Sequence, residues 1–294
     1  MLRRLRRATR PLRHGLLFVG LQAFAGALRL LPLDVSLAVG ALLGRVVGGV
    51  ARADRRRMRA FLARVPAPPS VGACFADLGR RVAELVNARR MEGRCEVDPA
   101  ALAAWQQAHA LGRGVLVATA HLGHWELMAA ALAARGVPFL AVGARPQGGP
   151  LFAWLARLRA GLGVVVLAPG GGARTARQVL QAGGTVALFV DQATREKSRP
   201  VPFLGAPAPV PRTLERLQAA TGAPILFVWS LRGSDGRYRI EAAALPTLEA
   251  ITTHLEALVK AHPAQWIGLH DRWRPRERAR LKSSKSERFL STRP

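Results

Sequence analysis

Short apolar runs alternate with helical stretches along the chain from residue 114 onward. Five runs rich in Val, Leu, Ile and Phe indicate strands, because strands covered on both faces of a sheet are continuously hydrophobic. These runs are 115–120, 139–142, 164–167, 186–190 and 225–229. Helical stretches lie between most of them, at 124–135, 150–161, 173–182 and 211–220. The pattern predicts an α/β fold with a central, mostly parallel sheet covered by helices.

Further elements flank this core. We expect amphipathic helices before it and an edge strand and a last helix after it. The expected helices are 70–91, 98–110 with Asp98 as its N-cap, and 248–261, and the expected edge strand is 237–242. We expect residues 191–205 to form a basic loop, and the glycines at 170–172 to form a tight turn rather than a phosphate loop.

The N-terminal stretch combines clustered arginines with two apolar segments. Six arginines and no acidic residue lie within residues 1–14, and the apolar segments 15–28 and 36–44 follow. Each segment is shorter than the ~20 apolar residues that a spanning helix needs. We expect residues 1–50 to be membrane-associated helices lying on or dipping into an anionic membrane. A helical pair packed on the domain and a single tilted span are the alternatives.

Composition narrows the class of partner. The 294 residues carry a formal net charge of +26, and half of them are hydrophobic. Such a charge fits nucleic acid, an anionic membrane, or an acidic protein or phosphorylated substrate. Nucleic-acid binding is the less favoured class, because aromatic residues are few and Tyr238 is the only tyrosine. Cys74 and Cys95 form no CxxC pair, so we expect a reducing compartment and packing roles.

The segment from His121 to Glu126 carries the candidate chemistry. His121 ends the apolar run 115–120, and Glu126 follows where the next helix begins. The two side chains can meet across a strand-to-helix turn, and a histidine held by a carboxylate is a minimal general base. A zinc site has neither HExxH nor a cysteine pair to support it. A structural histidine is the remaining alternative, and we favour it for His124.

His121 and Glu126 match the H-x4-[D/E] motif of the glycerolipid acyltransferase superfamily. Four further segments stand in the order and spacing of one of its branches: Val190-Asp191-Gln192, 202–205 (PFLG), 213–225 with TGAP at 221–224, and 265–275 (QWIGLHDRWRP). With these segments the chain resembles the bacterial lipid A biosynthesis acyltransferases, the lauroyl and myristoyl transferase group. The resemblance covers residues from about 98 to 275.

The resemblance implies direct transfer of a fatty acyl chain from acyl carrier protein, or from coenzyme A, to a hydroxyl of a membrane glycolipid. The acceptor expected first is a lipid A precursor, and a phosphatidylinositol mannoside or another lipid is the alternative. His121 would act as base and Glu126 would orient it, without metal or cofactor, while backbone N–H groups near the turn would hold the oxyanion. Substrate-binding roles are expected for Arg145, Asp191, Gln192, Arg195 and His270.

The chain is thus expected to have three parts. Residues 1–50 would associate with the membrane, residues 51–275 would form the acyltransferase domain, and residues 276–294 would be a basic, disordered tail. The donors that the resemblance implies are cytosolic. We therefore expect the protein on the cytoplasmic face of the bacterial inner membrane, as a peripheral, monotopic or single-pass protein.

Overall fold

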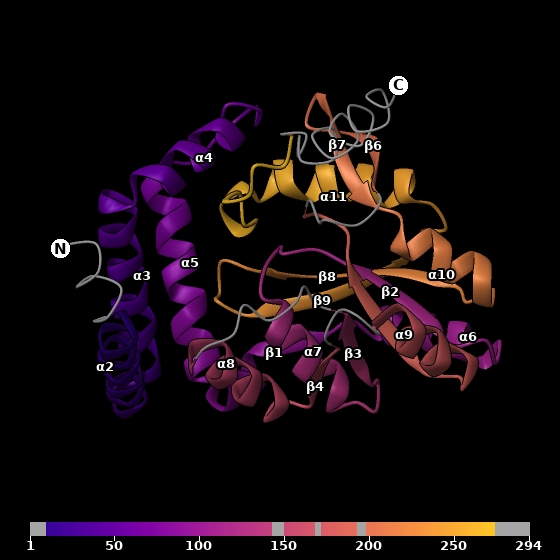
Figure 1. The fold of residues 1–294 in the computed structure, drawn as a ribbon, viewed down its shortest axis with the longest axis horizontal. Coiled ribbons are helices and arrows are strands. Elements are labelled where there is room, and N and C mark those ends of the chain that lie inside the picture. The colour runs from indigo at the N-terminus through magenta and orange to yellow at the C-terminus, as the bar shows by residue number, and fades with distance from the viewer. Residues whose placement is uncertain (1–9, 143–149, 168–171, 193–197, 274–294) are drawn as a thin grey trace, which may run out of the picture.

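A seven-stranded sheet forms the centre of the protein, in the order β1-β9-β8-β2-β5-β3-β4. The computed structural model describes residues 10–142, 150–167, 172–192 and 198–273 (Figure 1). The strands are β1 (Cys95–Val97), β2 (Val115–Thr119), β3 (Phe139–Val142), β4 (Val164–Leu167), β5 (Thr185–Phe189), β8 (Ile225–Arg232) and β9 (Tyr238–Ala244). Every pairing is parallel except that between β8 and β9. The predicted α/β class and mostly parallel sheet are confirmed.

Helices cover both faces of this sheet. They are α2 (Arg10–Leu30), α3 (Leu33–Val50), α4 (Arg52–Leu62), α5 (Val71–Val86), α6 (Pro99–Ala110), α7 (Trp125–Ala133), α8 (Pro150–Ala160), α9 (Gly172–Gln181), α10 (Thr213–Thr221) and α11 (Leu248–Ala261), with 3-10 turns at Ala88–Arg94 and Pro263–Gln265. Alternate residues of β2 face opposite cores. Leu116 packs with α9, α10 and α11, whereas Val117 packs with α6 and α7. Full burial of β2 explains its continuous apolar sequence.

The prediction of a basic loop over residues 191–205 is partly wrong. Ser198–Phe203 is strand β6, which pairs in an antiparallel hairpin with β7 (Ala206–Pro211). The connecting residues, Leu204 and Gly205, both have positive φ, as a tight two-residue hairpin turn requires. Both strands carry proline at alternate positions, and proline is disfavoured inside a sheet. The sequence pattern therefore did not predict this hairpin.

Helix α5 separates the N-terminal helices from the sheet (Figure 1). The contact between α3 and α5 is close because it uses glycine: a methyl group on Gly44 would collide with the carbonyl oxygen of Phe75, and one on Gly79 with that of Gly40. Three glycines of α3 therefore face α5, whereas Leu42, Val46 and Val50 of the same helix are more than half exposed. Two helices within residues 11–50 were expected, and the structure has them.

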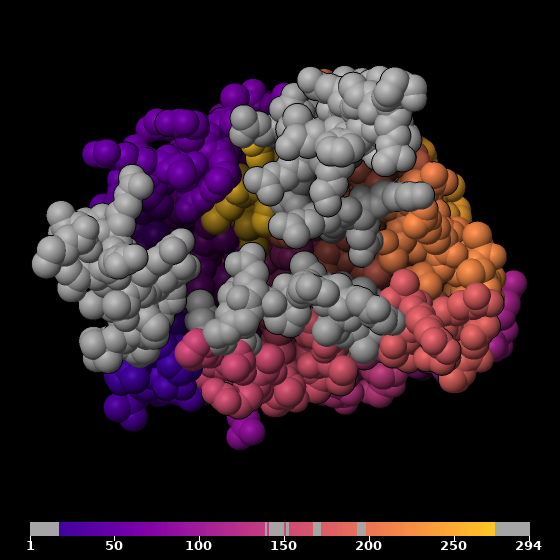
Figure 2. Space-filling view, viewed as in Figure 1, coloured from indigo at the N-terminus to yellow at the C-terminus, as the bar shows by residue number. Residues whose placement is uncertain are grey.

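The C-terminal part of the described chain packs against helices of the N-terminal half. On the face shown in Figure 2, the violet surface of α4 and α5 adjoins the yellow surface at the C-terminal end of α11 and just beyond it. The ring of Phe61, on α4, lies 4.7 Å from that of Trp266, just after α11, in an edge-on arrangement. Trp266 is 1% exposed, so it belongs to the core. This contact brings the 265–273 segment to the carboxyl ends of the central strands.

Candidate active site

Strand β2 delivers His121 to the carboxyl edge of the sheet. The strand lies between β8 and β5, and the chain leaves it through a turn that leads into α7. The imidazole of His121 is partly exposed, with one fifth of the side chain accessible. Its ring lies 4.4 Å from that of Phe189 at the end of β5. A rigid strand therefore positions a histidine whose outer edge can reach a substrate.

The carboxylate that contacts this imidazole belongs to Asp191. Its Oδ1 lies 2.9 Å from Nδ1 of His121, and its Oδ2 accepts the backbone N–H of the same residue at 2.7 Å. Nε1 of Trp266 donates to Oδ2 at 3.0 Å. Asp191 follows β5, the parallel neighbour of β2, so both residues emerge at one sheet edge. With Nδ1–H donating to Asp191, Nε2 of His121 keeps its lone pair for a substrate proton.

The environment keeps the Asp191 carboxylate ionised. Burial by itself would raise the pKa of this side chain, which is 1% exposed. The charge and hydrogen bonds of His121 and the charge of Arg272 act in the opposite direction and lower the pKa of Asp191 to about 2. At neutral pH the site therefore holds a buried anion next to an imidazole, which is the arrangement that stabilises an imidazolium.

Glu126 occupies a different position from the one expected. Its Oε1 accepts from Nη2 of Arg159 at 3.0 Å, and its Oε2 lies 3.5 Å from Nδ1 of His124. The contact predicted between Glu126 and His121 is wrong for this structure, because the neighbouring strand supplies Asp191 instead. The guanidinium of Arg159 also lies over the ring of Trp125, 4.8 Å from its centroid. Glu126 and Arg159 thus form a second charged pair, on α7 and α8.

His124 caps helix α7. Its Nδ1 accepts the N–H of Leu127 at 3.4 Å, and its Nε2 lies 3.0 Å from the carbonyl oxygen of Arg81, to which it donates. Burial lowers the pKa of His124 from its ordinary value, so the ring is neutral. These contacts agree with the structural role expected for His124.

Other parts of the chain bind the backbone of the turn at 121–124. The N–H of Gly123 donates to the carbonyl of Gln265 at 2.9 Å, and the N–H of Ile267 donates to the carbonyl of His121 at 3.1 Å. Oγ of Ser230 accepts the N–H of His124. Three amides of the turn, those of His121, Gly123 and His124, already have acceptors. These three amides cannot also donate to an oxyanion, so the expected oxyanion donors are other amides near the turn.

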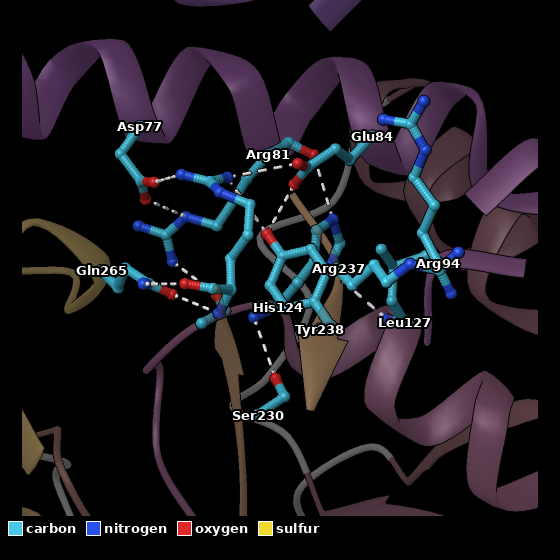
Figure 3. Close-up of polar contacts among 12 residues, drawn as sticks. Asp77, Arg81, Glu84, Arg94, His124, Leu127, Ser230, Arg237, Tyr238 and Gln265 are labelled. Carbon is cyan, nitrogen blue, oxygen red and sulfur yellow. Dashed lines mark hydrogen bonds and ion pairs between the residues drawn. The ribbon is translucent and has the colours of Figure 1, made fainter. Parts of the chain in front are cut away.

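A buried ionic network on α5 supports the same turn (Figure 3). Nη1 of Arg81 donates to the carbonyl of Gly123 at 2.7 Å, and Nε of Arg81 pairs with Asp77 at 2.9 Å. Arg232, on β8, also pairs with Asp77 and reaches Glu84 at 3.2 Å. The hydroxyl of Tyr238 donates to Glu84 at 2.7 Å. The network joins α5, β8 and β9 behind the turn, so its charges are compensated without a ligand.

The structure describes two of the other four residues that were expected to bind substrate. Arg145 and Arg195 lie outside the described residues. His270 is exposed, and its ring lies 6.4 Å from that of His121. Gln192 follows Asp191 at the strand end and is half-buried. Within the described ranges, no three His, Cys, Asp or Glu side chains gather as metal ligands would.

Both cysteines lie in buried surroundings. Burial raises the pKa of the Cys74 thiol to about 11 and that of Cys95 to about 12. Neither thiol is therefore ionised at neutral pH, and neither has the thiolate that a nucleophile needs. This state agrees with the packing roles expected from the sequence.

Sequence reasoning missed three partners in this region: Asp191 as the carboxylate on His121, Trp266 as a further donor to Asp191, and Arg159 as the partner of Glu126. One signal was present for Asp191, because it ends an apolar run, as His121 does, and parallel strands place such residues at one edge. No pattern in the sequence indicated the Trp266 or Arg159 contacts, which depend on how distant segments pack.

Comparison with known proteins identifies the family of the chain. The family model described as "Bacterial lipid A biosynthesis acyltransferase" matches residues 4–275. Phosphatidylinositol mannoside acyltransferases of two strains of Mycobacterium tuberculosis are each 27% identical to the chain over 177 residues. That alignment covers 56% of this chain and 56% of each relative, so the chain spans just over half the length of the relatives it matches. Because the family model covers nearly the whole chain, the protein belongs to the bacterial lipid A biosynthesis acyltransferase family.

Proposed function

We propose that the protein transfers a fatty acyl chain from a thioester donor to a hydroxyl of a membrane glycolipid, with His121 as general base and Asp191 as the carboxylate that orients it. The observation that carries this proposal is the contact of Asp191 with both the ring and the backbone of His121. That contact fixes the tautomer in which Nε2 can accept a proton.

The reaction proceeds without an acyl-enzyme. Nε2 of His121 takes the proton of the acceptor hydroxyl while the oxygen attacks the thioester carbonyl carbon. The tetrahedral intermediate then collapses, the C–S bond breaks, and the imidazolium returns its proton to the leaving thiolate. The amides of Trp125 and Glu126, at the start of α7, have no acceptor among the described residues. We propose them as donors to the oxyanion.

A lipid A precursor is the acceptor that we propose first, on the description of the matched family. A phosphatidylinositol mannoside is the second candidate, on the names of the curated relatives. Both are anionic glycolipids, which suits a protein of formal charge +26. Acyl carrier protein, itself acidic, or coenzyme A would supply the acyl chain. Membership of an acyltransferase family favours this reading over nucleic-acid binding.

The outer face of α3 is the proposed membrane contact. Within the described residues this is the one helix whose length and composition would allow it to cross a membrane. Apart from Asp34 and Arg45, its large exposed side chains are apolar. Four arginines of α4 are exposed next to it in the chain: Arg52, Arg56, Arg57 and Arg59. An apolar face beside clustered cations matches an anionic bilayer surface, as proposed for the cytoplasmic leaflet of the inner membrane.

The test is acyl transfer by purified protein. Palmitoyl-acyl carrier protein or palmitoyl-coenzyme A is supplied with either a lipid A precursor or phosphatidylinositol mannoside, and mass spectrometry of the lipids detects the acylated product. We expect His121→Ala to lower the rate by about 10²–10⁴-fold while the protein remains folded. Near-normal turnover by folded His121→Ala would contradict the mechanism, and absence of product from every donor and acceptor pair would contradict the proposed substrates.

A further inference from the structure

Arg272 is a buried arginine that the mechanism so far does not use. Its side chain is 1% exposed. Nη1 donates to the carbonyl of Pro209, in β7, at 2.6 Å, and Nη2 donates to the carbonyl of Val190 at 3.3 Å. Its Nε is buried and has no hydrogen-bond partner. Among the described residues, no carboxylate lies within 4.0 Å of this guanidinium.

An isolated cation in this position is energetically unfavourable. Taking a charge out of water costs several kcal/mol unless an opposite charge and hydrogen bonds compensate for it. Two carbonyl oxygens compensate in part. The electrostatic partner that remains is the Asp191 carboxylate, which follows directly after the Val190 carbonyl that Arg272 holds. The interaction is through space, because the two groups form no ion pair.

We propose that Arg272 is a positioning residue of the catalytic pair. Its charge balances the buried Asp191 anion and tunes how tightly the His121–Asp191 pair holds a proton, while its hydrogen bonds fix the end of β5. This inference rests on the proposed function and adds to it a third charged group, behind the carboxylate. A positive charge behind the carboxylate disfavours an extra proton on the pair, and a general base must be free of that proton before it accepts the one of the hydroxyl.

The charged groups around the His121–Asp191 pair determine in which direction the pH–rate profile shifts. Within the described part of the chain, His121 and Arg272 are the titratable side chains that act on Asp191, and Trp266 contributes a neutral N–H. His270 is the other histidine near the His121 ring. A positive charge behind the carboxylate disfavours protonation of the pair. Its removal must therefore shift the acid limb of the pH–rate profile toward higher pH.

The experiment compares a neutral and a charged replacement. Arg272→Gln and Arg272→Met remove the charge, and Met fills a similar volume without leaving unpaired donors. Arg272→Lys keeps the charge but cannot hold both carbonyls. We measure kcat/KM against pH with palmitoyl-coenzyme A and the acceptor, lipid A precursor or phosphatidylinositol mannoside, that the wild-type protein acylates. The neutral variants should shift the acid-limb midpoint upward by roughly one pH unit, the size of one charge acting over several ångström at an effective dielectric constant of about 20.

Arg272→Lys should keep the wild-type midpoint and lose thermal stability. The matched control is Arg199→Gln, in strand β6 of the hairpin that Arg272 contacts; Arg199 pairs with Glu215 and Glu249. It should lower stability without moving the midpoint.

Three outcomes separate the possibilities. A folded neutral variant with an unchanged midpoint would overturn the inference. If the neutral variants do not fold, a Lys variant whose midpoint rises would also overturn it, because the charge is still present. An inactive wild-type protein would instead contradict the proposed function.

Discussion

The most informative perturbation distinguishes the two carboxylates of the site. Asp191→Asn and Glu126→Gln each replace an anion with an amide of nearly the same shape. In the structure Asp191 contacts His121, whereas Glu126 contacts Arg159 and His124. If contact determines function, the two variants must differ in rate, although the family motif pairs His121 with Glu126.

The geometry predicts how Asp191→Asn fails. Oδ2 of Asp191 accepts two donors that cannot change, the backbone N–H of His121 and the indole N–H of Trp266. The amide oxygen of asparagine should therefore take this position, which leaves the NH₂ group facing Nδ1 of His121. Nδ1 must then become an acceptor, so the proton moves to Nε2 and the base has no lone pair for the acceptor hydroxyl. A wrong tautomer of this kind lowers kcat by about 10⁴-fold in a triad.

The stability change should be much smaller than the change in rate. In the folded protein the pKa of Asp191 falls from 3.8 to about 2. The ionised carboxylate therefore stabilises the fold by about 2 kcal/mol, at 1.36 kcal/mol per pKa unit. Because the folded pKa is the lower one, this contribution is present above about pH 4 and is lost as the pH falls toward 2. Asp191→Asn should lose about 2 kcal/mol at pH 7 and should respond less to acid in that window.

The assay measures kcat, KM and thermal unfolding for Asp191→Asn, for Glu126→Gln, and for the double variant that combines Asp191→Asn with His121→Ala. Glu126→Gln should lower kcat by about tenfold or less, because glutamine still accepts from Arg159 and the loss is that of one charge-assisted contact. Asp191→Asn should have little further effect once His121 is alanine. A folded Glu126→Gln protein that loses as much rate as Asp191→Asn would refute the reasoning, and would show that Glu126 acts on His121 in the working complex.

Two further predictions follow from the backbone and the surface. Gly123→Ala should abolish activity and lower thermal stability, because Gly123 has a φ of 61° and an added methyl would collide with the carbonyl of Ser230. The control Gly112→Ala, at a φ of 69° in open space, should cost only about 1–2 kcal/mol of stability in the same melting assay. Equal losses of stability in the two variants would contradict the steric argument. The double variant Leu42→Gln, Val46→Gln should bind anionic liposomes at least roughly tenfold more weakly in a flotation assay. The control Val82→Gln, at an exposed site on α5, should bind them as the wild-type protein does. Unchanged flotation of the double variant would place the membrane contact elsewhere.

The sequence determined the fold class and the place of His121. Continuous apolar runs such as β2 and β5 indicate buried parallel strands, since only a sheet covered on both faces buries every side chain of a strand. A histidine at the end of such a run must lie at the carboxyl edge of the sheet. Local capping signals were also sufficient for helix starts, as with Asp98, whose side chain accepts the N–H of Ala100.

Only the tertiary structure decided which carboxylate contacts His121. In the sequence Glu126 is five residues away from His121, and Asp191 is seventy away. The pairing of β2 with β5 brings Asp191 next to the imidazole, while the start of α7 turns Glu126 toward Arg159. The burial of Arg272 depends in the same way on segments distant in the chain, since its two acceptors are Val190, directly after β5, and Pro209 in β7. Sequence spacing constrains contacts within one helix or turn, whereas contacts between elements depend on sheet order and packing.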